Sequence, residues 1–200
     1  MSEISASVLA GGRSRRLGVD KSLLRVCGES LLERILTTLA SLTDDLLVVA
    51  DNGDKLPHLA ARIVPDARPG MGPLGGIYSG LRAMRGDRGL FLACDMPLLN
   101  PYLLRYMVLL SADFDVVIPR IGAGVEPLHA VYSKACIGPI ESSLNRSELR
   151  VVRFFPEVRV RYVEQHEIDI FDPNNLSFFN INCPADLTRA EELIEGSGSK

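Results

Sequence analysis

Short, apolar, β-prone runs alternate along this chain with longer amphipathic segments. The runs that we expect to form strands lie near residues 4–10, 45–50, 62–65, 88–94 and 114–119. Helices are expected over residues 30–42, 54–61, 74–85 and 100–111. Alternation of strand and helix favours a mainly parallel sheet with helices on both faces. The sequence therefore predicts a three-layer α/β fold.

The pattern changes after Pro119. A glycine-rich turn at residues 122–124 and an extended run at 128–132 predict a hairpin over one end of the sheet. Beyond it we expect helical segments over 133–146 and 148–154, strands over 158–163 and 178–182, and a last helix after Pro184. We expect residues 1–195 to form a single domain and residues 196–200 to form a flexible tail.

Composition excludes several classes of function. A chain of 200 residues that is 46% apolar can build one self-sufficient core. A net charge of −3 argues against a general nucleic-acid binder, and no run approaches the roughly 20 apolar residues of a membrane span. The four cysteines show no C-x-x-C pair or zinc spacing, and the N-terminus does not read as a signal peptide. We therefore expect a cytoplasmic protein with reduced thiols.

The first predicted strand ends at Gly11-Gly12, where a cationic loop begins. Glycines allow close approach of the backbone to a ligand, and successive N–H groups in such a turn form an anion site. The loop adds four cations and a single acid, Asp20; the cations are Arg13, Arg15, Arg16 and Lys21. The spacing is neither that of a P-loop nor that of the G-x-G-x-x-G dinucleotide fingerprint. It predicts a phosphate site of another kind.

Three more segments are expected at the carboxyl ends of strands, where open α/β sheets bind their ligands. The run 63–66 ends on Asp66, the apolar run 90–94 leads into Asp95, and residues 178–182 carry Asn180 and Asn182. A carboxylate directly after a buried strand is suited to hold Mg²⁺ near phosphate groups. Asp95 is therefore our candidate metal ligand, with a turn residue before Pro97 as the alternative.

These segments together resemble the molybdenum cofactor guanylyltransferases, whose N-terminal pattern is L-A-G-G-x-S-x-R-M-G-x-D-K. Residues 9–21 match every fixed position except Leu17, which replaces methionine. The family's V-x-D, G-P-L-G-G, C-D-M-P and F-x-N-x-N-T-P-x-D-L segments follow in order at residues 64–66, 72–76, 94–97 and 178–187. Two departures are Cys183 in place of threonine, and Ala50 where some members carry asparagine.

The resemblance implies a Rossmann-like nucleotidyltransferase fold and assigns roles to particular residues. The implied nucleotide-binding residues are Leu9, Ala10, Gly11, Gly12, Lys21, Asp66 and Asp95. Lys21 and Asp95 are the implied catalytic residues, and Asp95 is the implied ligand of the Mg²⁺ cofactor. The residues implied to face molybdopterin are Arg16, Gly75, Asn180 and Asn182. For residues 72–76, a plain helix N-terminus is the alternative interpretation.

The implied reaction transfers GMP from GTP to molybdopterin and releases pyrophosphate. The product would pass to cofactor-accepting apo-enzymes. Three alternatives are the same chemistry with CTP, a non-catalytic nucleotide-binding protein, and an oxidoreductase. The missing dinucleotide fingerprint disfavours the oxidoreductase. Two further residues lie close to these segments: Cys94 is expected in the core, and His129 either lines the cleft or is a hydrogen-bonded strand histidine.

Overall fold

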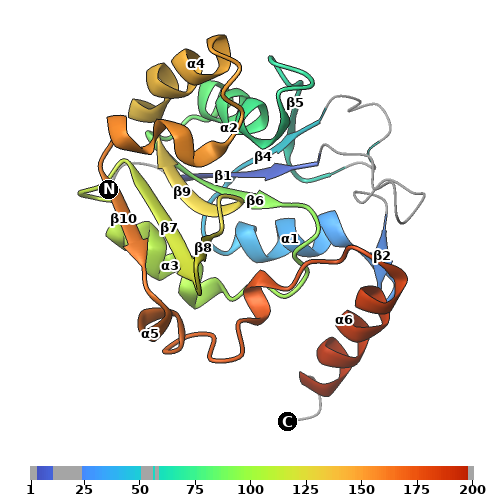
Figure 1. Ribbon diagram of the computed structural model, residues 1–200. Coiled ribbons are helices and arrows are strands. Elements are labelled where there is room, and N and C mark those ends of the chain that lie inside the picture. The colour runs from blue at the N-terminus through green and yellow to red at the C-terminus, as the bar shows by residue number, and fades with distance from the viewer. Residues whose placement is uncertain (1–3, 11–23, 51–55, 57–58, 198–200) are drawn as a thin grey trace.

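Within the residues that it describes, 4–10, 24–50, 56 and 59–197, the computed structural model is built on an eight-stranded sheet (Figure 1). Seven strands follow one another across the sheet in the order β10-β7-β9-β6-β1-β4-β5, and β8 pairs with β7. Their bounds are β1 Ile4–Leu9, β4 Asp45–Val49, β5 Arg62–Val64, β6 Arg88–Ala93, β7 Val116–Ile121, β8 Gly124–Val125, β9 His129–Ser133 and β10 Val160–Val163. A separate two-stranded ribbon joins β2 Arg25–Val26 to β3 Glu29–Ser30. The expected α/β sheet is confirmed.

Strand β9 is the main departure from a parallel sheet. It lies between β6 and β7 and is antiparallel to both, whereas β1, β4, β5 and β6 pair in parallel. The prediction of a hairpin over one end of the sheet is therefore wrong in its placement. The glycine-rich turn at 122–124 closes only the short β7–β8 pair, and the following run enters the main sheet.

Helices cover both faces of the sheet, as predicted (Figure 1). Helices α1 Leu31–Ala40, α3 Pro101–Leu110 and α5 Gln165–Ile168 contribute buried side chains to one core. Helices α2 Gly72–Ala83 and α4 Ile137–Asn145 pack on the other side with the 3₁₀ segment Val151–Glu157. Two shorter 3₁₀ turns span Lys134–Cys136 and Leu176–Phe178, and α6 Pro184–Ser197 is the last helix. Among the described residues, no helix has both the length and the apolar character needed to cross a bilayer.

The two cores follow from the alternation of side chains along each strand. In β1, Val8 belongs to the core beneath α1 and α3, whereas its neighbour Leu9 belongs to the core beneath α2 and α4. Leu92 and Phe91 divide in the same way in β6. Because these strands are covered on both faces, they are apolar almost throughout, which is the pattern that made them recognisable.

Helix α1 begins where its sequence predicts. The Ser30 hydroxyl accepts a hydrogen bond from the Glu33 backbone N–H at 3.1 Å, and the Glu33 carboxylate accepts one from the Ser30 backbone N–H at 3.2 Å. This reciprocal capping box satisfies two N–H groups that a helix start leaves unpaired. The side chains buried by the helix lie on one face: Leu31, Leu32, Ile35, Leu36 and Leu39.

Several expected elements differ in the structure. The described residues of the predicted helix 54–61, namely 56 and 59–61, are not helical, and its other residues lie outside the described part. Residues 178–182 form no strand; they continue from a 3₁₀ turn as irregular chain. The helical segment predicted at 148–154 is a 3₁₀ helix at Val151–Glu157. Helix α6 continues to Ser197, two residues into the segment expected as a tail.

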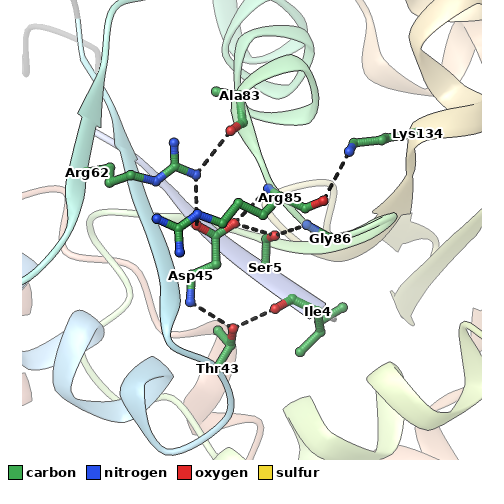
Figure 2. Close-up of polar contacts among 9 residues, drawn as sticks. All are labelled: Ile4, Ser5, Thr43, Asp45, Arg62, Ala83, Arg85, Gly86 and Lys134. Carbon is green, nitrogen blue, oxygen red and sulfur yellow. Dashed lines mark hydrogen bonds and ion pairs between the residues drawn. The ribbon is translucent and has the colours of Figure 1, made fainter. Parts of the chain in front are cut away.

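A buried carboxylate joins the strands at the edge opposite their carboxyl ends (Figure 2). Asp45 opens β4, and its side chain is only 4% exposed. It accepts hydrogen bonds from the Ser5 hydroxyl at 2.6 Å and from the Arg85 backbone N–H at 2.8 Å. The Arg62 guanidinium donates to it at 2.7 Å. One side chain thus ties together β1, β4, β5 and the turn before β6.

The surroundings of Asp45 stabilise its ionised form. Burial alone would raise its pKa, but hydrogen bonds from Ser5, the Arg85 backbone and Arg62 together outweigh that effect. The Arg62 guanidinium acts in the same direction, so the pKa of Asp45 lies below its ordinary value. Removing the carboxylate would leave the buried Ser5 hydroxyl and the Arg85 backbone N–H without this acceptor, and unsatisfied buried donors are destabilising.

We predict that Asp45→Ala lowers the free energy of unfolding by about 1–3 kcal/mol, the usual cost of leaving buried hydrogen-bond donors without their acceptor. The neighbouring Asp44 is exposed, so Asp44→Ala is the matched control and should change stability by less than about 0.5 kcal/mol. Denaturant titrations at pH 7 measure both. Because the folded pKa is lowered, the stabilising effect is present above the unfolded pKa and is lost as the pH falls toward the folded one. Equal stability of the two variants at pH 7 would contradict this assignment.

Candidate functional site at the carboxyl edge of the sheet

The strand registers bring three of the four predicted site segments, those that follow β1, β5 and β6, to one edge of the sheet. Leu9 at the end of β1 is opposite Val49 of β4 and Ala93 of β6, and Val49 is in turn opposite Val64 of β5. The ladder continues past the strands, since the Ala10 N–H donates to the Val49 carbonyl at 2.9 Å. Ligands of parallel sheets bind beyond such carboxyl ends. The predicted edge is therefore present.

Asp95 lies two residues beyond β6, in a turn, and its side chain is partly buried. Its backbone carbonyl accepts a hydrogen bond from the Ile181 N–H at 3.0 Å. This bond joins the turn after β6 to the segment that carries Asn180 and Asn182. The structure thus brings Asp95 beside residues more than 80 positions away in the chain, as the predicted site requires.

Asp66 lies two residues beyond β5 and organises the turn into α2. One of its carboxylate oxygens accepts hydrogen bonds from the Ser79 hydroxyl at 2.7 Å and from the Arg68 backbone N–H at 2.9 Å. The Ser79 hydroxyl oxygen also accepts from the Ala67 N–H at 2.9 Å. These contacts hold the β5–α2 turn against the helix. Contact of Asp66 with a nucleoside stays a prediction.

Residues 72–76 form the first turn of α2, which was the alternative interpretation of this motif. Gly75 is buried, and a Cβ atom there would lie 2.8 Å from the Arg68 carbonyl oxygen. At Gly76 a Cβ atom would lie 2.6 Å from the Leu9 side chain. The glycines therefore serve close packing of α2 on the preceding turn and on β1. A role for Gly75 toward a substrate stays a prediction.

The two asparagines lie in the irregular stretch between the 3₁₀ turn and α6. The Asn180 side-chain amide donates to the Phe178 carbonyl at 3.1 Å. The Asn182 backbone N–H donates to the carboxylate of Asp186, which also accepts from the Cys183 N–H at 2.9 Å. Asp186 therefore supports the start of α6. Cys183, which replaces the family's threonine, takes part through its backbone N–H in the second of these bonds.

The cationic loop of the predicted site lies outside the described residues. This covers Gly11, Gly12, Arg16 and Lys21 among the predicted site residues. Leu9 and Ala10 are described, and both are more than 90% buried, so their side chains pack in the core. Ala50 is buried in the same way, and its methyl group offers no polar contact to a base.

His129 is a buried strand histidine, but it is not hydrogen-bonded as that interpretation assumed. It is 0% exposed, and within the described part of the chain neither ring nitrogen has a hydrogen-bond partner. The ring packs against Phe178, with 4.7 Å between ring centroids. Burial lowers its pKa to about 4, against a smaller raising effect of the Asp172 charge. Cys94 is buried in the core, as predicted.

Glu126 is a residue at this edge that the sequence analysis missed. It lies in the connection from β8 to β9, where its carbonyl accepts from the His129 N–H and the Leu128 carbonyl accepts from the Ala93 N–H at the end of β6. Burial raises the pKa of the half-buried Glu126 carboxyl. In the sequence, Glu126 lies two residues before the extended run 128–132. That position does not distinguish a functional carboxylate from an ordinary loop residue.

Two grooves lie beside this edge. One, of about 480 Å³, is bounded by α1, the loop after Asp95 and α6; its lining includes Arg34, Asn100 and Ile194. The other, of about 340 Å³, lies between the end of β5 and α2, next to Asp66. Neither is lined by Leu9, Ala10, Asp66 or Asp95. These two grooves therefore adjoin the predicted site residues without being lined by them.

Comparison with known proteins identifies the family. Residues 6–161 match the MobA-like NTP transferase domain. The chain belongs to the MobA-like NTP transferase family. A relative from Pelotomaculum thermopropionicum, named a probable molybdenum cofactor guanylyltransferase, is 40% identical over 98% of this chain and 96% of its own. A molybdenum cofactor guanylyltransferase of Syntrophotalea carbinolica is 36% identical, covering 97% and 93%.

A solved structure supports the same family assignment. The crystal structure of molybdopterin-guanine dinucleotide biosynthesis protein A from Archaeoglobus fulgidus has a TM-score of 0.85, with 29% identity over 96% of this chain and 99% of that one. The MobA-like NTP transferase match spans β1 to β10, and so includes Leu9, Ala10, Asp66 and Asp95. It ends before Asn180 and Asn182, which only the full-length relatives cover. The expected family and fold are confirmed.

The burial of His129 predicts a specific loss of stability in acid. Its folded pKa of about 4 lies below the ordinary value of 6.5, so the unfolded chain takes up this proton first. As the pH falls from 6.5 toward 4, the fold should lose about 1.4 kcal/mol per pH unit, roughly 3 kcal/mol in all. His129→Leu removes the titration. The unfolding free energy of wild type, relative to that of the variant, should therefore fall by this amount between pH 6.5 and 4. Denaturant titrations from pH 7.5 to 4 measure this difference. A difference that stays constant with pH would show that burial does not lower the pKa of His129.

Proposed function

We propose that this protein transfers the guanylyl group of GTP to molybdopterin and so forms molybdopterin guanine dinucleotide. The observation that carries the proposal is full-length similarity, at 40% identity, to a protein named a molybdenum cofactor guanylyltransferase. The membership in an NTP transferase family supports it, as does the position of Asp66 and Asp95 beyond the carboxyl ends of β5 and β6, two strands of the same parallel set.

The reaction needs little from the protein as an acid or base. An oxygen of the molybdopterin phosphate forms a bond to the α-phosphorus of GTP. The bond from that phosphorus to the oxygen bridging it to the β-phosphorus breaks, and pyrophosphate leaves with the electron pair. A phosphate monoester has its second pKa near about 6, so the attacking group is already ionised at neutral pH. Catalysis then rests on positioning and on neutralising charge.

The proposed roles follow the edge of the sheet. The backbone of residues 9–12 would lie against the nucleotide and Lys21 would neutralise its phosphates, with Asp66 beside the nucleoside. On the acceptor side, we assign Asn180 and Asn182 to molybdopterin, along with Arg16 and Gly75. The hydrogen bond from the Ile181 N–H to the Asp95 carbonyl, which joins their segment to the turn that carries Asp95, supports the assignment of Asn180 and Asn182.

Mg²⁺ fits the donors present at this edge. Among the described residues there is no cluster of three or more His, Cys, Asp or Glu that could hold a metal ion by itself. Mg²⁺ does not require one, because it commonly uses one or two carboxylates together with substrate phosphates and water. Asp95 would supply the carboxylate. When bound there, the ion would neutralise charge that develops on the phosphates.

The setting of the reaction is part of the proposal. None of the four cysteines, all of which are described, forms a disulfide bond, which is consistent with a cytoplasmic, reducing environment. We further propose that the dinucleotide product passes to apo-enzymes that accept the cofactor.

The proposal predicts pyrophosphate release that depends on molybdopterin, GTP and Mg²⁺ together. GTP should react at least about 100-fold faster than CTP or ATP, since a pocket that pairs with the polar edge of one base discriminates strongly against others. The test incubates the protein and molybdopterin with each nucleotide, and measures pyrophosphate and the dinucleotide by mass spectrometry. A preference for CTP would reassign the protein as a cytidylyltransferase. Binding of GTP with no product from any nucleotide would support a non-catalytic nucleotide-binding protein.

A second prediction concerns Asp95 as the metal ligand. Asp95→Asn keeps the shape of the side chain but removes the charge that Mg²⁺ prefers, so the Mg²⁺ concentration needed for half-maximal rate should rise about tenfold or more. The melting temperature should stay near that of wild type. Asp113→Asn changes an exposed carboxylate away from the edge and is the matched control.

Lys21→Ala serves as a comparison in the same titration. Loss of one charge-stabilising group should lower turnover by about 10²–10³ without moving the Mg²⁺ midpoint. An Asp95→Asn variant that melts well below wild type, yet keeps its Mg²⁺ midpoint, would show that Asp95 has a structural role only.

A further inference from the structure

Residues 171–182, which we term the strap, cross from α5 to α6 in irregular chain and one 3₁₀ turn (Figure 1). The strap is fixed near its start by Asn100, the residue that caps α3. The Asn100 backbone N–H donates to the Ser177 hydroxyl at 3.0 Å, and its side-chain amide donates to the Phe171 carbonyl at 2.7 Å. At the far end, Ile181 is fixed to Asp95 through the backbone bond described above.

The first half of the strap is held by its own contacts. Asp172 is 95% buried, and its carboxylate accepts hydrogen bonds from the backbone N–H groups of Leu176 at 2.9 Å and Ser177 at 2.7 Å. Asn175 adopts the left-handed conformation, at φ 54°, that this tight turn requires. The turn is thus a rigid unit seated on the start of α3, and the stretch 178–180 spans the gap from it to Asp95.

Phe178 is the residue of this stretch that reaches back to the sheet near β6. Its ring packs on His129, and its carbonyl accepts the hydrogen bond of the Asn180 amide. The position of Phe178 therefore sets the position of the Asn180 side chain. Phe179 packs with a different cluster, around Val26 and Ile181.

His129 offers a fixed surface for this contact. The β6–β9 ladder places His129 opposite Leu92, three residues before Asp95. The backbone N–H of His129 donates to the Glu126 carbonyl. Its ring is fully buried, and its nitrogens have no hydrogen-bond partner among the described residues, so the ring acts here through packing. Burial of such polar atoms is normally avoided, and each instance calls for an explanation.

We propose that His129 is a positioning residue for the acceptor substrate: through Phe178 it holds Asn180 at the carboxyl end of β6. The inference rests on the proposed function, because it takes Asn180 to face molybdopterin. It adds a residue that touches neither substrate, yet sets the affinity for only one of them. Strand β1, which leads into the residues assigned to GTP, lies on the opposite side of β6 from β9, the strand that carries His129.

A double-mutant cycle tests the coupling. His129→Ala and Phe178→Ala should each raise the KM for molybdopterin by roughly three- to tenfold, the size expected for one lost ring contact, while the KM for GTP stays within about twofold. The double variant should be no worse than the more affected single variant, because both remove the same contact. His129→Leu, which keeps an apolar surface of similar volume beneath Phe178, should restore the wild-type KM.

Val131→Ala is the matched control for lost volume. Val131 lies in the same strand two residues further on, is 1% exposed and faces the same core, but lies away from the strap. It should lower the melting temperature about as much as His129→Ala and leave both KM values unchanged. If His129→Ala behaves like Val131→Ala in the kinetics, or if the two single effects add in the double variant, the proposal is wrong.

Hydrogen exchange gives a readout that does not depend on activity. His129→Ala should lose protection selectively at the backbone amides of residues 178 and 181, whereas Val131→Ala should not. Loss of protection at these amides in a protein that makes no dinucleotide would keep His129 as the support of the strap and overturn only the proposed function. Unchanged protection in His129→Ala overturns the inference itself.

Discussion

The parallel pairing of β1 with both of its neighbours is the constraint on which the rest of this molecule depends. Because β4 and β6 run in the same direction as β1, each has its amino end at one edge and its carboxyl end at the other. The two edges then have different tasks. Asp45 gathers hydrogen-bond donors from β1, β5 and the turn before β6 at the amino edge, and the carboxyl edge is left to loops that can bind a substrate. The common direction of these strands thus places the stabilising contacts of Asp45 and the proposed substrate site at opposite edges of the sheet.

Close approach of α2 to the sheet is the second condition for this edge. A side chain at Gly80 would meet the Phe91 ring at 2.5 Å, as one at Gly76 would meet Leu9. These glycines let the helix lie low over β1 and β6, which brings its first turn near the ends of the strands. The G-P-L-G-G motif therefore has a packing explanation that stands beside its proposed role in binding, and its presence alone does not establish the latter.

The sequence was a good guide wherever one local rule dominated. Apolar runs predicted the buried parallel strands, and the Ser30–Glu33 pair predicted the start of α1, because each signal lies within a few residues. It failed where the outcome depended on distant partners. The run 128–132 is extended as predicted, but only its pairing with both β6 and β7 decides that it enters the sheet. The role of Asp45 within the predicted strand 45–50 was not foreseen, since its partners lie up to 40 positions away.

The strap is a second region whose structure could not be predicted from the sequence, because it depends on distant partners. Residues 178–182 have the composition of a strand, yet they pair with none, because Ser177 is fixed to Asn100 and Ile181 to Asp95 at a spacing that suits a bridge. A bridge fixed at two points still leaves its middle free to move sideways unless something packs beneath it. His129 supplies that surface, although leaving ring nitrogens unsatisfied opposes folding by an amount that an aliphatic side chain would avoid. The strap is therefore held at both ends by hydrogen bonds and in its middle by the ring contact between Phe178 and His129.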